Sequence, residues 1–316
     1  MKINVISRKS KLALWQTEFV AKLLESDGHE IALSTMETVG DRNLNAPLAE
    51  IGGKGLFTAE LEKKLLLGES DIAVHSAKDL QSDLPDNLEI IAFTERERAH
   101  DVLVSDKTGI DLSDSSKPLR LGTSSVRRKA FLKKYYPWVN IVDVRGNLQT
   151  RVKKMRDGLC DALLLAYAGV ARMGYTSLIV HEFPINQFIP PVGQGTIAVE
   201  AATGMDKEKR EKIRNCVNHA GTEICLLAER AFLKKMNGGC SIPVFAHAIS
   251  ENGGICLNAG IASLGGEQMI IKEKKIFFSD GAGAAQLGTN LAEEILSSGG
   301  REILEKILRG MKKTTA

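Results

Sequence analysis

The sequence contains no apolar run long enough to cross a membrane, because its longest uncharged apolar stretch, residues 162–171, is about half a membrane span. Its first eight residues have neither the apolar core nor the cleavage pattern of a secretory signal, which favours a cytoplasmic protein. Cysteine is scarce, with five in 316 residues, odd in number and unclustered. This scarcity excludes a disulfide framework and predicts reduced thiols. The protein is therefore expected to have no membrane partner.

The chain also lacks an excess of charge of one sign, with 42 basic against 39 acidic side chains and a net charge of +3. On average this balance argues against a dedicated nucleic-acid binder. An apolar fraction of 43% with 26% charged residues excludes wholesale disorder. The length predicts two or three domains.

Short β-rich runs alternate with amphipathic helical patterns through the first two thirds of the chain. This alternation predicts βαβ units and a mostly parallel sheet. The pattern restarts after Leu119, which indicates two α/β domains of similar size. The last hundred residues instead contain a helix, three strand-like runs and two closing helices. That order is typical of a small α+β domain with an antiparallel sheet.

The near-neutral average hides a basic segment at residues 120–156, which holds eleven basic side chains and one acid. Two helices with solvated basic faces would account for this composition. Position favours an anion site, because Gly122-Thr-Ser-Ser-Val-Arg-Arg128 and Arg145-Gly-Asn147 each follow a strand and open a helix, with Arg151 one turn on. Guanidinium groups bind carboxylates through two parallel hydrogen bonds, so a polycarboxylate ligand is the better hypothesis.

The first domain offers matching groups at the ends of its own strands. Arg8 and Ser10 follow the first strand, and His75-Ser-Ala-Lys-Asp79 follows a buried one. Asp79 is either a structural carboxylate paired with a cation, or a charge that stabilises a cationic intermediate or moves protons. The glycine-rich loop that contains Lys54 is either an ordinary flexible loop or a mobile segment with one cation, and it lacks the pattern of a phosphate loop.

Two cysteine patterns carry chemical interest. Cys216-x2-His219-x5-Cys225 has a spacing that suggests metal ligands, but both cysteines lie at apolar positions of helical patterns, so no metal site is expected. Cys240 follows two glycines in a loop, where a thiol is either structural or accessible and reactive. His75 is expected to be a satisfied core or loop histidine.

Together these segments resemble the porphobilinogen deaminase (hydroxymethylbilane synthase) family over essentially the whole chain. So many motifs in one order are specific, whereas any one of them alone is weak. The chain departs from the usual family pattern at Lys11 and Gln81, where proline is common, and at residues 97–101. The matching segments are Ser7-Arg8-x-Ser10-x-Leu-Ala-Leu-Trp-Gln16, Gly52-Gly-Lys-Gly-Leu-Phe57, Asp71-Ile-Ala-Val-His-Ser-x-Lys-Asp79, Gly122-Thr-Ser-Ser-x-Arg-Arg128, Arg145-Gly-Asn147, Ala168-Gly-x-x-Arg172, Val192-Gly-Gln-Gly195, Ala228-Glu-Arg230 and Gly238-Gly-Cys240.

The resemblance implies an α/β fold with two doubly wound domains, like the lobes of periplasmic binding proteins, and a small α+β C-terminal domain. Domain one would comprise residues 1–98 and 196–217, domain two residues 99–195 and domain three residues 218–316. The implied reaction joins four porphobilinogen molecules head to tail, releases ammonia and yields hydroxymethylbilane in tetrapyrrole and haem biosynthesis. The family also suggests a monomer.

The resemblance further implies a dipyrromethane cofactor in thioether linkage to Cys240, with Asp79 stabilising the cations that form during the reaction. Lys54 would lie on a lid loop. The residues implied to hold the acetate and propionate groups of the cofactor are Lys78, Thr123, Ser125, Arg127, Arg128 and Arg151. Those implied to hold the incoming substrate are Arg8, Ser10, Arg145 and Arg172.

The residues leave two other function classes open. A non-enzymatic two-lobed polycarboxylate-binding protein would use the same lobes, but it has no need of Cys240. A nucleic-acid binder would suit the basic segment, although no aromatic residues are interleaved with the cations and the cations sit at separate strand ends.

Overall fold

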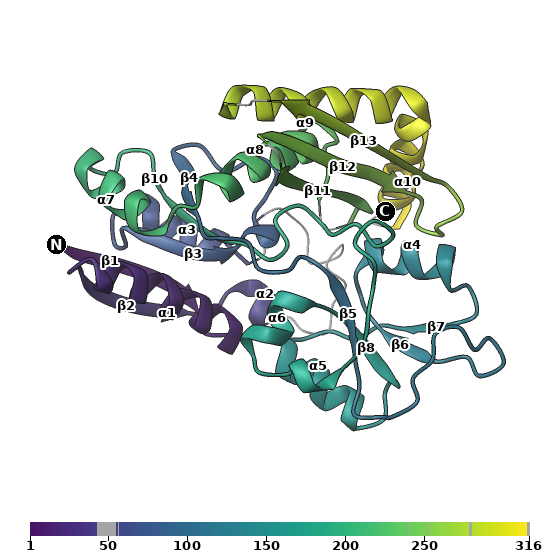
Figure 1. The fold of residues 1–316 in the computed structure, drawn as a ribbon. Coiled ribbons are helices and arrows are strands. Elements are labelled where there is room, and N and C mark those ends of the chain that lie inside the picture. Colours follow the sequence, from purple (N-terminus) through teal and green to yellow (C-terminus); the bar gives the residue numbers. More distant parts are fainter. Residues whose placement is uncertain (43–54, 56, 240, 252, 278–279, 315–316) are drawn as a thin grey trace.

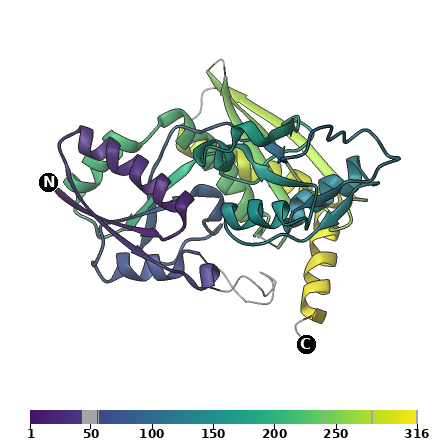
Figure 2. The same cartoon turned by 90° about the horizontal axis from the view of Figure 1, so that it is seen from below.

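The computed structural model describes residues 1–42, 55, 57–239, 241–251, 253–277 and 280–314, arranged around three β-sheets (Figure 1). Two five-stranded sheets form two lobes, and a three-stranded sheet with long helices lies across them. The two termini lie far apart in the turned view (Figure 2). Among the described residues, no helix has the length and apolar character needed to span a bilayer.

The first sheet has the strand order β2-β1-β3-β10-β4. In it β1 runs parallel to β2 and β3, whereas β10 runs antiparallel to β3 and β4. The helices that accompany this sheet are α1 (Lys11–Ser26), α2 (Val39–Arg42), α3 (Ala59–Leu66) and α7 (Lys207–Val217). The strands are β1 (Lys2–Arg8), β2 (Glu30–Met36), β3 (Ile72–Ser76), β4 (Leu88–Phe93) and β10 (Ile197–Ala202).

The second sheet repeats this layout in the order β7-β6-β8-β5-β9. β6 is parallel to β7 and β8, and β5 is antiparallel to β8 and β9. Its helices are α4 (Val126–Tyr135), α5 (Leu148–Arg156) and α6 (Tyr167–Arg172), with a 3₁₀ turn, η2, at Thr176–Leu178. Its strands are β5 (Asp101–Val104), β6 (Arg120–Gly122), β7 (Asn140–Val142), β8 (Ala162–Ala166) and β9 (Ile179–Glu182).

The expectation of a mostly parallel sheet is therefore wrong for half of the pairings. The antiparallel strand of each sheet is the one through which the chain enters from the other lobe: β5 after residues 94–100, and β10 after residues 183–196. Parallel neighbours need a crossover helix that carries the chain back to the edge of the sheet where the previous strand began. A strand that enters directly from the other lobe has no such helix, so it runs antiparallel to its neighbours. The sequence pattern of local βαβ units contains no information about these two crossings.

Helix starts are the most accurately predicted feature. Ser10, Ser125 and Asn147 each cap a helix by accepting a backbone N–H bond three residues on, at 3.3, 3.4 and 2.9 Å. All three follow a strand, as expected. The sequence does not predict α6 or α7. α7 has many charged residues and buries only Ile213 and Val217, which is too sparse for a recognisable apolar period.

The third unit confirms the expected antiparallel α+β pattern. β11 (Val244–Glu251), β12 (Gly254–Ala262) and β13 (Met269–Phe277) pair as consecutive antiparallel strands. Around them pack α8 (Ala220–Lys235), α9 (Gly281–Ile295) and α10 (Arg301–Thr314), the last two joined by the π-type turn η3 (Leu296–Gly300).

The core of the third unit extends into the lobes. Ala77 and Val192, beside the two crossings, belong to the same buried cluster as α8 and β11. On the other side, the rings of Phe245 and Phe131 lie 4.9 Å apart, in the core of the second sheet. The strands of the three sheets come from the parts of the chain expected for three domains, while the exact domain boundaries stay a prediction.

Candidate functional site

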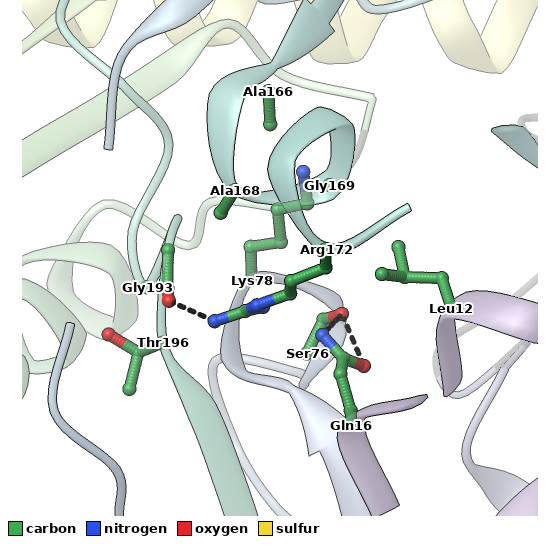
Figure 3. A pocket seen from close by; sticks show the side chains of 11 residues that line it. Leu12, Gln16, Ser76, Lys78, Ala166, Ala168, Gly169, Arg172, Gly193 and Thr196 are labelled. Atoms are coloured by element: carbon green, nitrogen blue, oxygen red, sulfur yellow. Dashed lines mark hydrogen bonds between the residues drawn. The ribbon is translucent and has the colours of Figure 1, made fainter. Parts of the chain in front are cut away.

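The carboxyl ends of the parallel strands face each other across the two lobes. A pocket between them is lined by Ser76 at the end of β3 and Lys78 after it, by Ala168 and Arg172 of α6, and by Thr196 at the second crossing (Figure 3). The Arg172 guanidinium donates to the carbonyl of Gly195 at 2.6 Å, and Gln16 bonds to Ser76 at 2.9 Å. This pocket is thus built from both lobes and the returning chain.

A second pocket lies beside the first and contains Arg8, Ser10 and Asp79. Asp79 ends the 3₁₀ turn η1 (Ala77–Asp79) directly after β3 and keeps 36% of its side chain exposed. The nearest Arg8 nitrogen lies 4.0 Å from its carboxylate, and the Arg8 guanidinium also lies over the ring of Phe57 at 4.4 Å. A carboxylate exposed to a pocket and flanked by a cation can meet a positively charged reactant there.

Arg127 and Arg128 are held by a buried carboxylate that the sequence analysis did not identify. Asp101, at the start of β5, binds Arg127 at 2.6 Å and Arg128 at 2.7 Å, and all three residues are at most 6% exposed. Arg127 also donates to the Ile189 carbonyl, and Arg128 donates to the Leu164 carbonyl, each at 2.9 Å. Burial opposes ionisation of Asp101, but the two guanidinium charges outweigh it and lower its pKa.

Three other cations at the site are partly buried with too little negative charge around them. Burial, reinforced by the charge of Arg128, lowers the pKa of Lys78 to about 8. Burial also lowers the pKa of Arg151 to about 10 and that of Arg172 to about 10. A buried cation whose pKa falls lacks a full counter-ion, so an anionic ligand would gain from binding beside it.

The other residues expected on the second lobe lie at its strand ends. Thr123 is buried and accepts a bond from the Ser125 backbone at 3.3 Å, and Ser125 caps α4. Arg145 follows β7 and its carbonyl accepts from Lys154, while Arg151 donates to the Gly146 carbonyl at 2.7 Å. Arg151 lies close enough to Asp79 and Arg128 for their charges to affect its pKa.

Several cations of the basic segment are paired with acids. Arg120 binds Asp161, Lys129 binds Asp143 and Lys153 binds Asp157. Arg156 binds Asp106 in the same way. The local excess of charge therefore overstates the ligand site, which is a smaller group of cations at the strand ends.

Two expected site residues, Lys54 and Cys240, lie outside the described residues. His75, expected to be a satisfied core or loop histidine, is buried, and its Nε2 lies 3.1 Å from a Glu200 carboxylate oxygen on β10 without hydrogen-bond geometry. Gln81, one of the departures from the family pattern, offers its carbonyl to Arg230 at 2.8 Å.

Gln194 and Glu229 also hold the site together, and the sequence analysis gave neither a role. Gln194 donates to Asp101 at 3.1 Å and to the Ala99 carbonyl at 2.7 Å, which ties the second crossing to the first. The fully buried Glu229 of α8 binds Arg96 at 2.7 Å and the Gly193 amide at 2.9 Å. Gln194 and Glu229 lie inside the family motifs Val192-Gly-Gln-Gly195 and Ala228-Glu-Arg230. Their position as polar residues in these motifs could have identified them from the sequence.

The glycines of the second crossing are required by close approach. Gly195 has φ +91°, and a Cβ there would lie 2.2 Å from the Glu97 carbonyl oxygen of the first crossing. At Gly193, with φ +76°, a Cβ would lie 2.9 Å from Ala77, next to Lys78. The backbones of the two crossings therefore touch at the position where the site is built.

This fold and site define a two-lobed protein with several cations lining the pockets at its strand ends. The family comparison makes the class specific: the model described as "Porphobilinogen deaminase, dipyromethane cofactor binding domain" matches residues 3–211, and "Porphobilinogen deaminase, C-terminal domain" matches residues 223–297. The chain belongs to the porphobilinogen deaminase family.

Curated relatives agree over nearly the full length. A porphobilinogen deaminase from Desulfosudis oleivorans is 53% identical over 307 residues, covering 97% of this chain and 98% of the relative. One from Cytophaga hutchinsonii is 50% identical over 312 residues, covering 99% of each.

Solved structures give weaker similarity. The periplasmic VFT2 domain of BvgS from Bordetella pertussis has a TM-score of 0.41 at 17% identity, covering 68% of this chain and 86% of that domain. The methionine-binding protein MetQ has a TM-score of 0.43 at 12% identity, covering 68% and 89%.

Replacing Asp101 by asparagine should destabilise the protein by about 3–5 kcal/mol, because two buried guanidinium groups lose their shared counter-ion. Urea unfolding followed by circular dichroism measures the change in the free energy of unfolding. Asp143→Asn is the matched control: it removes the partner of Lys129 at a carboxylate that is 64% exposed, and should cost less than about 1 kcal/mol. Equal effects of the two substitutions would show that the Asp101 cluster is not a structural centre.

Proposed function

We propose that this chain condenses four porphobilinogen molecules head to tail into hydroxymethylbilane with release of ammonia, as a transferase of tetrapyrrole biosynthesis. The observation that carries this function is the partly exposed carboxylate of Asp79, which lies beside Arg8 and near the incompletely neutralised cations Lys78 and Arg151. Porphobilinogen carries two carboxylates and an aminomethyl group, so a site for it needs cations at its edges and an anion at the reacting centre.

The residues present fit the dipyrromethane cofactor that the family model names. Lys78 and Arg151 lack full counter-ions, and carboxylates of the cofactor would supply them. Thr123 adds a hydroxyl group to the same side of the site, and Ser125 adds the N-terminus of α4. When bound, the cofactor supplies the pyrrole carbon to which the first substrate is joined. We propose its attachment by a thioether to Cys240, which follows α8 and precedes β11.

Arg127 and Arg128 belong to the cofactor side in a less direct way. With Asp101 they form a group with a net charge of +1 whose hydrogen bonds are largely used internally. They raise the positive potential around the cofactor carboxylates and fix the start of α4. This potential acts on Lys78, because the charge of Arg128 contributes to the lowered pKa of the lysine.

Arg8, Ser10, Arg145 and Arg172 form the proposed substrate side. Arg172 uses one nitrogen on the Gly195 carbonyl and lies over the ring of Trp15 at 5.5 Å, which leaves the rest of its planar fork for a carboxylate. Arg8 lies between Phe57 and Asp79, so it can bind a substrate carboxylate beside the reacting centre. The lid role of Lys54, which lies outside the described residues, rests on the family resemblance alone.

Asp79 is the proposed catalytic residue. Loss of ammonia from the aminomethyl group leaves positive charge spread over the substrate pyrrole, and an adjacent carboxylate lowers the energy of that charge. The same oxygens can accept the pyrrole N–H and orient the ring. After the new carbon–carbon bond forms, the attacked ring must lose a proton, and a carboxylate within the pocket can accept it.

A polycarboxylate-binding protein without activity would use the same cations, but it would not need an exposed carboxylate at their centre. The family membership favours the enzyme.

The first prediction concerns the covalent cofactor. Intact-mass measurement of the purified protein should give an excess equal to two condensed pyrrole units, and Cys240→Ser should lose both that excess and the activity. Cys256→Ser, at a half-buried thiol on β12, should keep both. An active wild type without added mass would rule out the assignment.

The second prediction concerns Asp79. Asp79→Asn should lower kcat by about 10²–10³-fold with little change in the free energy of unfolding, because it removes charge stabilisation at an exposed side chain. Steady-state product formation and thermal unfolding test the two parts. Asp83→Asn is the control, since Asp83 binds Lys234 at the surface and should keep full activity. Near-normal turnover in Asp79→Asn would contradict the role.

The third prediction concerns pH. Without a bound carboxylate, Lys78 loses its proton as pH rises through about 8, because its pKa is lowered to that value. The rate at which cofactor-free protein gains the mass of the cofactor from porphobilinogen should then fall relative to Lys78→Arg, whose side chain stays charged. Taking the ratio of the two rates between pH 7 and 9 cancels the ionisation of the attacking thiol. A ratio that stays constant would show that deprotonation of Lys78 does not affect how the cofactor is gained, and would contradict the proposed role of Lys78.

A further inference from the structure

Three potential metal ligands meet at the end of the first lobe that lies away from the catalytic cleft. Asp27 is the C-cap of α1, His29 lies in the turn before β2, and Cys216 lies in the last turn of α7. One ligand atom from each side chain lies within 4.8 Å of the other two. α1 starts at Ser10 in the cleft, so its 16 residues separate the two places by about 24 Å.

His29 is the unusual member of this group. Its side chain is only 7% exposed, yet neither ring nitrogen has a hydrogen-bond partner. Nε2 lies 3.4 Å from an Asp27 oxygen, which is a charge contact without hydrogen-bond geometry. Buried polar atoms are nearly always bonded, so an imidazole enclosed in this way is missing a partner.

The chemistry of the three side chains matches one class of partner. Imidazole nitrogen, thiolate and carboxylate oxygen are the ligands that zinc takes in proteins, at about 2.0–2.3 Å. Tetrahedral geometry at those lengths separates ligand atoms by about 3.3–3.8 Å. Since the ligand atoms lie within 4.8 Å of one another, the group must contract by at most about 1–1.5 Å at its longest edge. The Asp27 side chain, 64% exposed at a helix end, is free to make this adjustment.

We propose that Asp27, His29 and Cys216 bind one divalent transition-metal ion of the zinc type, with water in the fourth position. The carboxylate and the thiolate supply two negative charges, which match the ion. Burial and the adjacent Asp27 carboxylate raise the pKa of the Cys216 thiol. Binding therefore breaks the S–H bond, forms a sulfur–metal bond and releases the proton to solvent. Lys212 of α7 also feels the Asp27 charge, but it is bound to Glu208 at 2.6 Å.

The position of the site indicates a structural role. The metal would join the turn after α1, near the start of the chain, to α7, which follows the return from the second lobe. Directly after α7, Asn218 accepts from the Phe93 amide at 2.9 Å, and the His219 amide donates to the Phe93 carbonyl at 2.7 Å. A metal at Cys216 would therefore fix the base of the connection to the third unit.

The ligands are not those that the spacing around Cys216 suggests. His219 caps α8 through a 3.1 Å bond from the Thr222 amide, and Cys225 is buried in the core of the third unit. The partners of Cys216 are instead about 190 residues away in the sequence, so a local motif cannot contain them.

The test uses the full-length holoprotein, freed of metal by a chelator and titrated with Co²⁺ and with Zn²⁺. Co²⁺ should give a sulfur-to-metal charge-transfer band that saturates at one ion per chain, and Zn²⁺ should abolish the band. Cys216→Ser and His29→Gln should each weaken Zn²⁺ binding at least tenfold in competition with a chromophoric chelator. Cys256→Ser should bind as the wild type does, and all variants should retain turnover.

The wild-type spectrum decides the proposal even where a variant folds poorly. Absence of the charge-transfer band, or a band that persists in Cys216→Ser, would overturn it. Zinc binding that is equal in wild type and His29→Gln would equally exclude the site. Zinc should also raise the Tm of wild type and leave that of Cys216→Ser unchanged, and a rise in both would assign the ion to another place.

Discussion

The site depends on the buried cluster in which Asp101 binds both Arg127 and Arg128. Asp101 begins β5, the strand through which the chain enters the second lobe, and it also accepts a bond from Gln194 at the returning crossing. One carboxylate therefore fixes the start of α4, the strand edge and both connections between the lobes. A buried carboxylate with two guanidinium partners keeps these elements in one geometry, because removing any member would leave an unpaired charge.

Around this cluster the protein maintains positive charge that it does not neutralise. Lys78, Arg151 and Arg172 have lowered pKa values because the loss of hydration on burial outweighs the attraction of nearby carboxylates such as Asp79 and Glu97. Such an arrangement disfavours the folded state and favours binding of anions. The surface cations of the same segment behave differently, since Arg120, Lys129 and Arg156 each have an acidic partner. The distinction between these two sets separates the proposed binding residues from cations that are paired at the surface.

Prediction from sequence succeeded where the signal was local. Helices start at Ser125 and Asn147 as expected, and each of these residues caps its helix by accepting from an amide three residues away. It failed for β10 and β5, whose antiparallel pairing follows from chain crossings between lobes. It did not anticipate that Arg127 and Arg128 pair with Asp101, since the sequence offers no sign that Asp101 lies opposite them. Glu229 was missed for the same reason: its partners at Arg96 and Gly193 are distant in the chain.

The sequence by itself determined the alternation of strands and helices, the helix starts and, through an ordered set of motifs, the family and its reaction. These features depend on hydrogen bonds and periodicities that span a few residues. The tertiary structure decided which cations remain without counter-ions, how the two crossings touch at Gly195, and which side chains surround His29. The physical reason is that burial and charge pairing are set by residues far apart in the chain, and only folding brings them within a few ångströms.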